Sequence, residues 1–200
     1  MVGRVACMLV LCLTGLVSIE SSSKTAGHAG QAAGAWTVLL DGTTLKGWNV
    51  VGDANWTVAD GAVQADKGTG FLVTPASYRD FQITLEFWVT DDANSGVFLR
   101  CSNPKAIDQT NAYEVNVFDK RPDQSYRTGG IVDVAKPASI IQTGGKWNTY
   151  DITAKGSQLT VVLNAAKVVD VKDTRHAEGP IALQYAAGTV KFRNVRIRQL

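Results

Sequence analysis

The stretch Phe81-Gln82-Ile83-Thr84-Leu85-Glu86-Phe87-Trp88-Val89 decides the fold of this chain. Its odd-numbered residues are all apolar, whereas its even-numbered residues are Gln, Thr, Glu and Trp. A β-strand sends successive side chains to opposite faces, so this alternation predicts a strand with one face in a hydrophobic core. The other face carries an amide, a hydroxyl, a carboxylate and an indole.

Two further alternating stretches follow along the chain, at residues 96–102 and 113–118. In each of them one face is apolar, and the other carries polar or aromatic groups. Aligning the apolar faces of the three strands predicts that seven other side chains share one sheet surface. These are Glu86, Trp88, Phe98, Arg100, Glu114, Asn116 and Phe118.

A carbohydrate is the ligand that this predicted surface fits. Sugars are bound by flat apolar surfaces together with a few fixed hydrogen-bonding groups, and the seven residues supply both. A ladder of Glu–Arg ion pairs between neighbouring strands is an alternative interpretation of the same residues. Each such cross-strand pair adds only about 0.2–1 kcal/mol to stability.

Short strand-like stretches recur along the rest of the chain and are separated by turn sequences such as Asp41-Gly42 and Asp60-Gly61. The predicted strands cover residues 36–40, 56–58, 62–65, 70–73, 81–89, 96–101, 113–118, 131–134, 147–153, 158–163, 167–171, 181–185 and 190–198. Many short strands at this spacing are typical of an all-β sandwich, jelly roll or barrel. Residues 36–200 are therefore expected to form one all-β domain, with no internal repeat of the kind that builds a propeller.

The first thirty residues have the order of a secretory signal peptide followed by a small-residue linker. Arg4 supplies the positive charge, residues 5–19 are largely apolar, and a small, polar run follows from Ser21 to Gly34. We expect cleavage between about Ser18 and Ala33, a secreted or periplasmic domain, and no stable membrane span afterwards. An uncleaved anchor is the alternative, but the apolar run is shorter than the ~20 residues that a bilayer needs. A lipoprotein is less favoured, because Leu11 rather than a small residue precedes Cys12.

The charge pattern argues against one class of partner, and the cysteine content argues against an internal disulfide. The formal charge of +2 is spread along the chain, and no cluster of Lys and Arg alternates with aromatic residues. Nucleic acid is therefore not an expected partner. Removal of residues 1–30 leaves Cys101 alone, so we expect no internal disulfide and a buried, unreactive thiol.

Nine strings of the chain occur in the order found in one family of domains. They are Leu39-Leu40-Asp41-Gly42 with Leu45-Lys46-Gly47-Trp48, Trp56-Thr57-Val58 with Asp60-Gly61, Tyr78-Arg79-Asp80-Phe81, Asn94-Ser95-Gly96-Val97-Phe98-Leu99-Arg100, Tyr113-Glu114-Val115-Asn116, Thr128-Gly129-Gly130-Ile131, Lys136-Pro137 with Lys146-Trp147-Asn148, Gly179-Pro180-Ile181-Ala182-Leu183-Gln184 and Val190-Lys191-Phe192-Arg193-Asn194-Val195-Arg196-Ile197. From Trp36 to Leu200 the chain thus resembles the 3-keto-disaccharide hydrolase domain family. The resemblance implies a concanavalin-A-like jelly-roll sandwich of two antiparallel sheets. It also implies hydrolysis of glycosides whose glucose unit has been oxidised at C3.

The implied reaction needs a general base, an electrophile and an acid. A ketone at C3 acidifies the C2 proton, so that a base can remove it and the C1 substituent can leave by elimination, after which water adds. We expect Glu114 to act in acid–base chemistry, Arg100 to hold the developing enolate as a fixed cation, and Asp119 to reach the rim of the same surface. The residues expected to bind substrate are Glu86, Trp88, Phe98, Asn116 and Gln184.

Two features leave other functions open. Family members often carry a histidine two residues after the glutamine that corresponds to Gln184. Here Gln184 is followed by Tyr185-Ala186, and we expect Tyr185 to stand in place of that histidine. A non-catalytic carbohydrate-binding module on the same fold, or a purely adhesive exported domain, would need no such base. His176 lies in a polar loop and is expected to be solvated.

Neither a histidine pair nor a cysteine pair suggests a metal motif in the predicted mature domain, and no cofactor is expected. Calcium in the loop of residues 91–94 is the one open metal alternative, since this cation accepts carboxylate and carbonyl oxygens.

Overall fold

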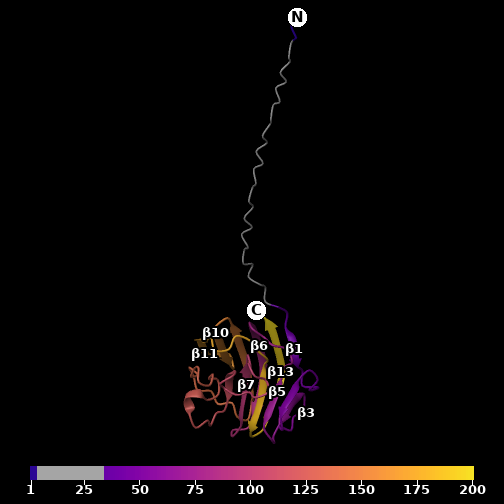
Figure 1. The fold of residues 1–200 in the computed structure, drawn as a ribbon. Helices are drawn as coiled ribbons and strands as arrows, with labels where there is room; N and C mark the ends of the chain where they lie inside the picture. The colour runs from indigo at the N-terminus through magenta and orange to yellow at the C-terminus, as the bar shows by residue number, and fades with distance from the viewer. Residues whose placement is uncertain (4–33) are drawn as a thin grey trace. The chain divides into compact units, whose positions relative to one another are not determined.

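The structure is a computed structural model that describes residues 1–3 and 34–200 (Figure 1). The predicted signal peptide and linker, residues 1–30, fall almost wholly outside the described residues. Cys12, the residue on which the alternative of a lipoprotein depends, also lies outside them. Among the residues that are described, there is no helix with the length and apolar character needed to cross a bilayer.

The larger of two β-sheets contains eight antiparallel strands. Its order is β11 (Ala166–Lys172), β10 (Gln158–Leu163), β9 (Trp147–Lys155), β6 (Phe81–Val89), β13 (Val190–Gln199), β4 (Ala62–Ala65) and β3 (Thr57–Ala59), and β1 (Thr37–Leu40) also pairs with β13. Strands β6 and β13 are a hundred residues apart in sequence yet lie side by side (Figure 1). We refer to this sheet as sheet A.

The second sheet, sheet B, contains five antiparallel strands in the order β2 (Asn49–Gly52), β5 (Gly70–Val73), β12 (Ala182–Ala187), β7 (Asn94–Leu99) and β8 (Tyr113–Val117). A single 3-10 turn, η1 (Gln124–Tyr126), follows β8. It begins at Asp123, whose side chain accepts a hydrogen bond from the amide of Ser125.

The core lies between the two sheets. The odd-numbered side chains of β6, from Phe81 to Val89, are 0–3% exposed, as the alternation predicts. Sheet B contributes inward-facing residues such as Val97 and Val115, both fully buried. The side chain of Tyr150 on β9 reaches across this core to sheet B. Its hydroxyl donates a hydrogen bond to the carbonyl of Asn116 on β8 at 2.6 Å. The predicted all-β jelly-roll sandwich of two antiparallel sheets is confirmed.

Two local predictions are wrong. Residues 131–134 form a tight turn instead of a strand, in which the amides of Val134 and Ala135 donate to the carbonyl of Ile131. Asp133 in this turn has a φ of 58°, which no extended strand allows. The edge strand β2 was not predicted, since four residues beside a glycine turn give too short a pattern.

A third correction concerns the surface predicted from the three alternating stretches. Strand β6 belongs to sheet A, whereas β7 and β8 belong to sheet B. The apolar faces of both sheets meet in the core, so their polar faces point away from each other. Glu86 and Trp88 therefore do not share a surface with Phe98, Glu114 and Asn116.

Arg100 also departs from the predicted surface. Strand β7 ends at Leu99, and Arg100 has a φ of 54°, so the alternation stops before its side chain. The guanidinium is only 2% exposed and donates to the carbonyls of Arg79 (2.8 Å), Gly156 (2.9 Å) and His176 (3.1 Å). It also lies 3.3 Å from the carboxylate of Asp80. This cation joins three loops at one end of the sandwich.

Replacing Arg100 by Met is expected to destabilise the fold strongly. The change removes the donor of the carbonyls of Arg79, Gly156 and His176 and the cation beside Asp80, a loss of about 3 kcal/mol or more. Chemical denaturation measures this difference. The matched control is Arg79→Ala, whose exposed ion pair with Glu178 is worth at most about 1 kcal/mol. Equal stabilities for Arg100→Met and wild type would contradict the structural role.

Candidate functional site

The outer face of sheet B carries the candidate site. A single row of paired residues runs across all five strands, from Asn116 on β8 through Gly96, Gln184 and Phe71 to Val51 on β2. The next row contains Glu114, Phe98 and Ala182. Because side chains alternate along each strand, both rows project away from the core.

Gly96 allows two neighbouring side chains to pack closely over the middle of this face. A β-carbon built on Gly96 would lie 3.3 Å from Cγ of Glu114 and 3.3 Å from Cε2 of Phe98. Both side chains therefore lean over the glycine, which is paired with Gln184 on its other side. The glycine φ is not in the left-handed region, so the residue is needed for space rather than for backbone conformation.

Glu114 is the one carboxylate in the row that also contains Phe98 and Ala182. The residue is 7% exposed, and burial raises the pKa of its carboxyl from 4.5 to about 7. Arg121 acts in the opposite direction and Asp133 adds to the increase. A carboxyl with a pKa near 7 can both accept and donate a proton at neutral pH.

Several polar atoms around Glu114 are buried and have no hydrogen-bond partner within the described residues. They are Oδ1 of Asn116, Oε1 of Gln184 and Nε of Arg121. Buried polar groups are nearly always satisfied, so two unsatisfied acceptors and an unsatisfied donor in this part of the molecule indicate a place for a polar ligand. Asn116 itself is fixed, because its Nδ2 donates to the carbonyl of Tyr126 at 2.6 Å.

An apolar hollow of about 270 Å³ adjoins Gln184 on the same face. Phe71 forms one wall and packs edge-on against Phe98, with ring centroids 5.3 Å apart. The opposite wall comes from the loop between β7 and β8, through Lys105 and Ile107. The face thus combines aromatic surfaces with fixed polar groups, which is how carbohydrate sites are built.

The structure brings three of the predicted site residues, Phe98, Asn116 and Gln184, together with Glu114 on this face, and their roles stay predictions. Asp119 lies behind it. Its carboxylate accepts hydrogen bonds from the hydroxyl of Thr128 (2.5 Å) and from the amide of Thr143 (2.6 Å), and lies 3.8 Å from Arg127. With an 8% exposed side chain, Asp119 ties loops together instead of reaching the rim.

Glu86 and Trp88 lie on the outer face of sheet A, where the alternative ion-pair ladder is what the structure shows. Glu86 accepts hydrogen bonds from Arg193 at 2.8 Å and from Asn194 at 2.7 Å. The ammonium of Lys191 lies 5.1 Å from the centre of the Trp88 ring. No such ladder joins Glu114 to Arg100.

His176 and Tyr185 also differ from expectation. His176 is buried at 9% exposure, its ring lies 4.8 Å from that of Tyr113, and burial lowers its pKa. Tyr185 is 4% exposed and faces the core, where its hydroxyl donates to the carbonyl of Gly188. Two residues after Gln184, the position on the outer face is occupied by Ala186 instead.

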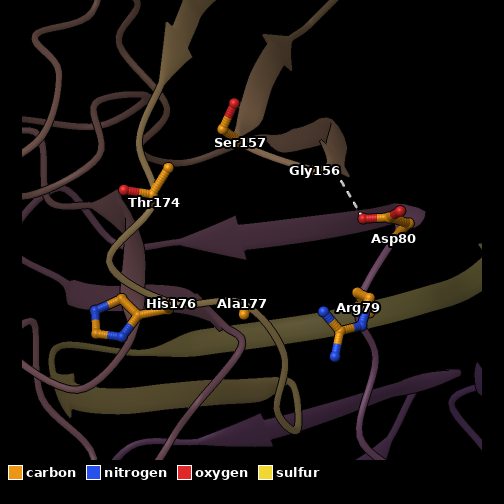
Figure 2. Close-up of a pocket in the computed structure, with 7 residues that line it drawn as sticks. All are labelled: Arg79, Asp80, Gly156, Ser157, Thr174, His176 and Ala177. Carbon is orange, nitrogen blue, oxygen red and sulfur yellow. Dashed lines mark hydrogen bonds between the residues drawn. The ribbon is translucent and has the colours of Figure 1, made fainter.

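A second hollow, of about 320 Å³, lies beside the Arg100 junction and is lined by Arg79, Asp80 and His176 (Figure 2). Its side chains do not converge on one point, because the ring of His176 points away from Asp80 (Figure 2). The Asp80 carboxylate is already bound to the amide of Gly156 at 2.8 Å. We therefore place the site on sheet B.

Cys101 is a free, buried thiol, as expected, and burial raises its pKa to about 12. In residues 1–3 and 34–200, no three histidine, cysteine, aspartate or glutamate side chains gather as a metal site. Calcium in the loop of residues 91–94 stays a prediction.

Sequence reasoning missed Arg121, Phe71 and Gly96. Arg121 follows the end of β8, where strand alternation gives no direction for a side chain. Phe71 lies on a strand of four residues, which is too short for its face to be assigned. Gly96 was detectable, since a glycine inside a strand indicates a close approach of neighbouring groups.

Fold and site together define a class, a jelly-roll sandwich with a carbohydrate-type site on the outer face of one sheet. The model of the 3-keto-alpha-glucoside-1,2-lyase-like domain matches residues 35–198. The chain belongs to that family, which also confirms the resemblance drawn from the nine strings.

Individual relatives are distant in sequence. A 3-keto-disaccharide hydrolase of Bacteroides thetaiotaomicron is 22% identical, over 84% of this chain and 79% of the relative. A crystal structure from Parabacteroides distasonis, provisionally described as a glycosyl hydrolase, has a TM-score of 0.74 at 22% identity and covers 83% of this chain and 94% of its own. A carbohydrate-binding module of Bacillus subtilis has a TM-score of 0.60 at 21% identity, with 74% and 93% covered. These structures share the fold with this chain.

The raised pKa of Glu114 predicts a pH-dependent stability. The folded state holds this proton more tightly than the unfolded state, so the free energy of unfolding falls as pH rises from about 4.5 to 7, by about 3 kcal/mol. Glu114→Gln removes this loss. Denaturation at pH 4 and pH 8 should find the variant about 3 kcal/mol more stable relative to wild type at the higher pH. A difference that does not change with pH would contradict the burial of an ionisable carboxyl.

Proposed function

We propose that this protein hydrolyses 3-keto-glycosides by elimination followed by hydration, with Glu114 as the proton-transfer group. The observation that carries the proposal is the position of Glu114. Its carboxyl is buried, has a pKa of about 7, and belongs to a side chain that packs over Gly96 on the outer face of sheet B. Family membership and the relative that is named a 3-keto-disaccharide hydrolase support the choice of substrate class.

In the first step, the ionised carboxylate of Glu114 removes the proton at C2 of the keto sugar. The electron pair of the C2–H bond forms an enolate with the C3 ketone. When the C1–O bond breaks, the C3 ketone re-forms, these electrons form the C1–C2 double bond, and the leaving oxygen takes the proton that Glu114 removed from C2. Water then adds at C1 and a proton returns to C2, so that the net reaction is hydrolysis.

Arg121 replaces Arg100 as the proposed cation of the site. Arg100 is fully engaged by backbone carbonyls, whereas Nε of Arg121 is buried without a partner and its charge acts on Glu114. A fixed guanidinium stabilises negative charge that develops on an enolate oxygen. Asn116 and Gln184 offer unpaired carbonyl oxygens to sugar hydroxyl groups.

We also propose that the domain acts outside the cytoplasm, after removal of the predicted signal peptide. The order of charged, apolar and small residues in positions 1–30 supports this. Detection of the mature N-terminus by mass spectrometry of exported protein tests it.

The test of the function is incubation with a chemically prepared 3-keto-glucoside, with and without chelator. Wild type should release the leaving group, and Glu114→Gln should lower kcat/KM by at least about a hundredfold, because general acid–base catalysis contributes that much. The activity should change with an apparent pKa near 7. Circular dichroism establishes that the variant is folded.

The matched control is Glu178→Gln, an exposed carboxylate on another part of the surface. It should keep the wild-type rate. Unchanged turnover in Glu114→Gln would contradict the assignment of Glu114 as the proton-transfer group.

A carbohydrate-binding module is the second candidate function, favoured by the aromatic surface of Phe71 and Phe98 beside unpaired amides. The same experiment separates the two. Tight calorimetric binding of an unmodified glycan, with no product from any keto sugar, would select the binding module.

Gly96→Val offers an independent test of the site's position. A side chain at residue 96 would occupy the space over which Glu114 and Phe98 lean. We expect loss of at least about tenfold in kcat/KM, with far-ultraviolet circular dichroism unchanged, because valine is favoured in strands. Full activity in this variant would place the reaction elsewhere on the molecule.

A further inference from the structure

We propose that the outer face of sheet A binds an anionic polysaccharide, that is, a linear glycan that carries carboxylate or sulfate groups. The inference does not depend on the proposed function, because this face lies on the opposite side of the sandwich from Glu114. It assigns a second binding surface to the protein, with a ligand class different from that of the keto sugar.

Strand β13 carries four cations along this face. Because β13 pairs with β6 and β6 pairs with β9, each cation begins a row of three residues that point away from the core. The four rows are Lys191 with Trp88 and Trp147, Arg193 with Glu86 and Thr149, Arg196 with Thr84 and Asp151, and Arg198 with Gln82 and Thr153.

A β-bulge in β13 keeps all four cations on the same face. Arg193 and Arg196 are three residues apart, so an unbroken strand would send their side chains to opposite faces. The register shifts between these two residues, where Asn194 has a φ of 53°. The extra residue of the bulge restores the outward direction for Arg196.

Two tryptophan rings hold the first two cations without neutralising them. The guanidinium of Arg193 lies 3.8 Å from the centre of the Trp147 ring, and the ammonium of Lys191 lies 5.1 Å from the centre of the Trp88 ring. A contact between a cation and an aromatic face fixes the position of the charge but leaves its sign and size unchanged. Charges that are already in place lower the entropic cost of binding an anion.

Trp36 holds the other two cations. Its ring centre lies 5.6 Å from the guanidinium of Arg196 and 4.9 Å from that of Arg198. Three of the five tryptophans of the chain therefore lie against the cations of β13. They come from distant positions in the sequence, so only the folded sheet brings basic and aromatic side chains together.

The carboxylates of this face do not cancel the positive charge. Glu86 pairs with Arg193 at 2.6 Å, and Asp151 accepts a hydrogen bond from the amide of Gln82 at 2.7 Å. Among residues 34–200, the cations of β13 that make no ion pair with a carboxylate are Lys191, Arg196 and Arg198. The whole chain has 20 basic and 18 acidic residues, so one strand carries a large share of its positive excess. Charge complementarity selects an anionic partner.

The shape of the surface favours a linear glycan among anionic partners. Neighbouring cations of each pair are about 7 Å apart along one strand, so they match a single chain of charges better than the two strands of a duplex. Trp88 and Trp147 are half-buried beneath their cations, so neither ring projects far enough to enter a bilayer. Hydroxyl groups that can bind those of a sugar are present on the same face, at Thr84, Thr149 and Thr153.

The experiment is calorimetric titration of the protein at low salt with polygalacturonate, dextran sulfate and neutral dextran. The first two polymers distinguish carboxylate from sulfate as the preferred anion. Wild type should bind at least one of them, and at least about tenfold more tightly than neutral dextran. A tenfold increase in salt concentration should weaken this binding by about tenfold or more, because exposed charges are screened.

Variants locate the binding on β13. Lys191→Glu combined with Arg196→Glu should lower the affinity for the preferred polymer by about tenfold or more. Trp36→Ala, which leaves the net charge unchanged, should lower it by about threefold, because two cations lose their support. The matched control is Lys46→Glu combined with Lys67→Glu, the same charge change at exposed lysines outside both sheets, and it should stay within about twofold of wild type. Circular dichroism establishes that each variant is folded.

Equal losses in the β13 variant and in the control would show attraction by net charge alone and would overturn the assigned surface. The same conclusion follows if wild type binds neither charged polymer at low salt. Tighter binding of duplex DNA, or of vesicles of phosphatidylcholine and phosphatidylglycerol, than of either polymer would overturn the ligand class. Cleavage of a keto sugar is measured separately, so failure of one proposal leaves the other standing.

Discussion

The contact between the apolar faces of β6 and of β7–β8 is the constraint on which the rest of the structure depends. Since the odd-numbered residues of β6 and Val97 and Val115 of sheet B are buried together, each sheet has one face left for other purposes. Sheet A uses its outer face for ion pairs such as Glu86–Arg193. The outer face of sheet B carries Glu114, whose carboxyl has a raised pKa, and the amides of Asn116 and Gln184, whose oxygens have no hydrogen-bond donor among the described residues. The two outer faces therefore differ because different residues of each sheet face away from the shared core.

Buried charges act in two different ways in this molecule. Arg100 and Asp119 are surrounded by partners and join loops, so their burial is compensated within the protein. Glu114 lacks such partners, and the cost of burying its ionised form appears as a raised pKa. A group that the fold leaves uncompensated is available for chemistry, whereas a compensated one is structural. This contrast, rather than residue type, separates the candidate acid–base group from the other charged residues that the sequence suggested.

Strand alternation predicted most of the fold and about half of the site. The periodicity of residues 81–89 and 113–118 gave the correct strands and the correct face of Glu114, Asn116 and Phe98, because a pleated strand has only two sides. It could not tell which of two sheets a strand joins, so Glu86 and Trp88 were assigned to the wrong surface. Arg100 failed for a local reason, since its left-handed backbone ends the alternation. Arg121 and the loop wall at Ile107 depend on tertiary folding of irregular segments, for which the sequence has no period.

The hydrogen bond from Tyr150 to the carbonyl of Asn116 has a consequence for how the two sheets move. The hydroxyl belongs to β9 of sheet A, and its acceptor lies on the edge strand of sheet B, two residues from Glu114. Sliding of one sheet over the other would break a bond buried in an apolar core, where no water replaces it. The sandwich therefore resists shear at the point where the reactive carboxyl is anchored. The part of sheet B that carries Glu114 is therefore held in a fixed position relative to sheet A.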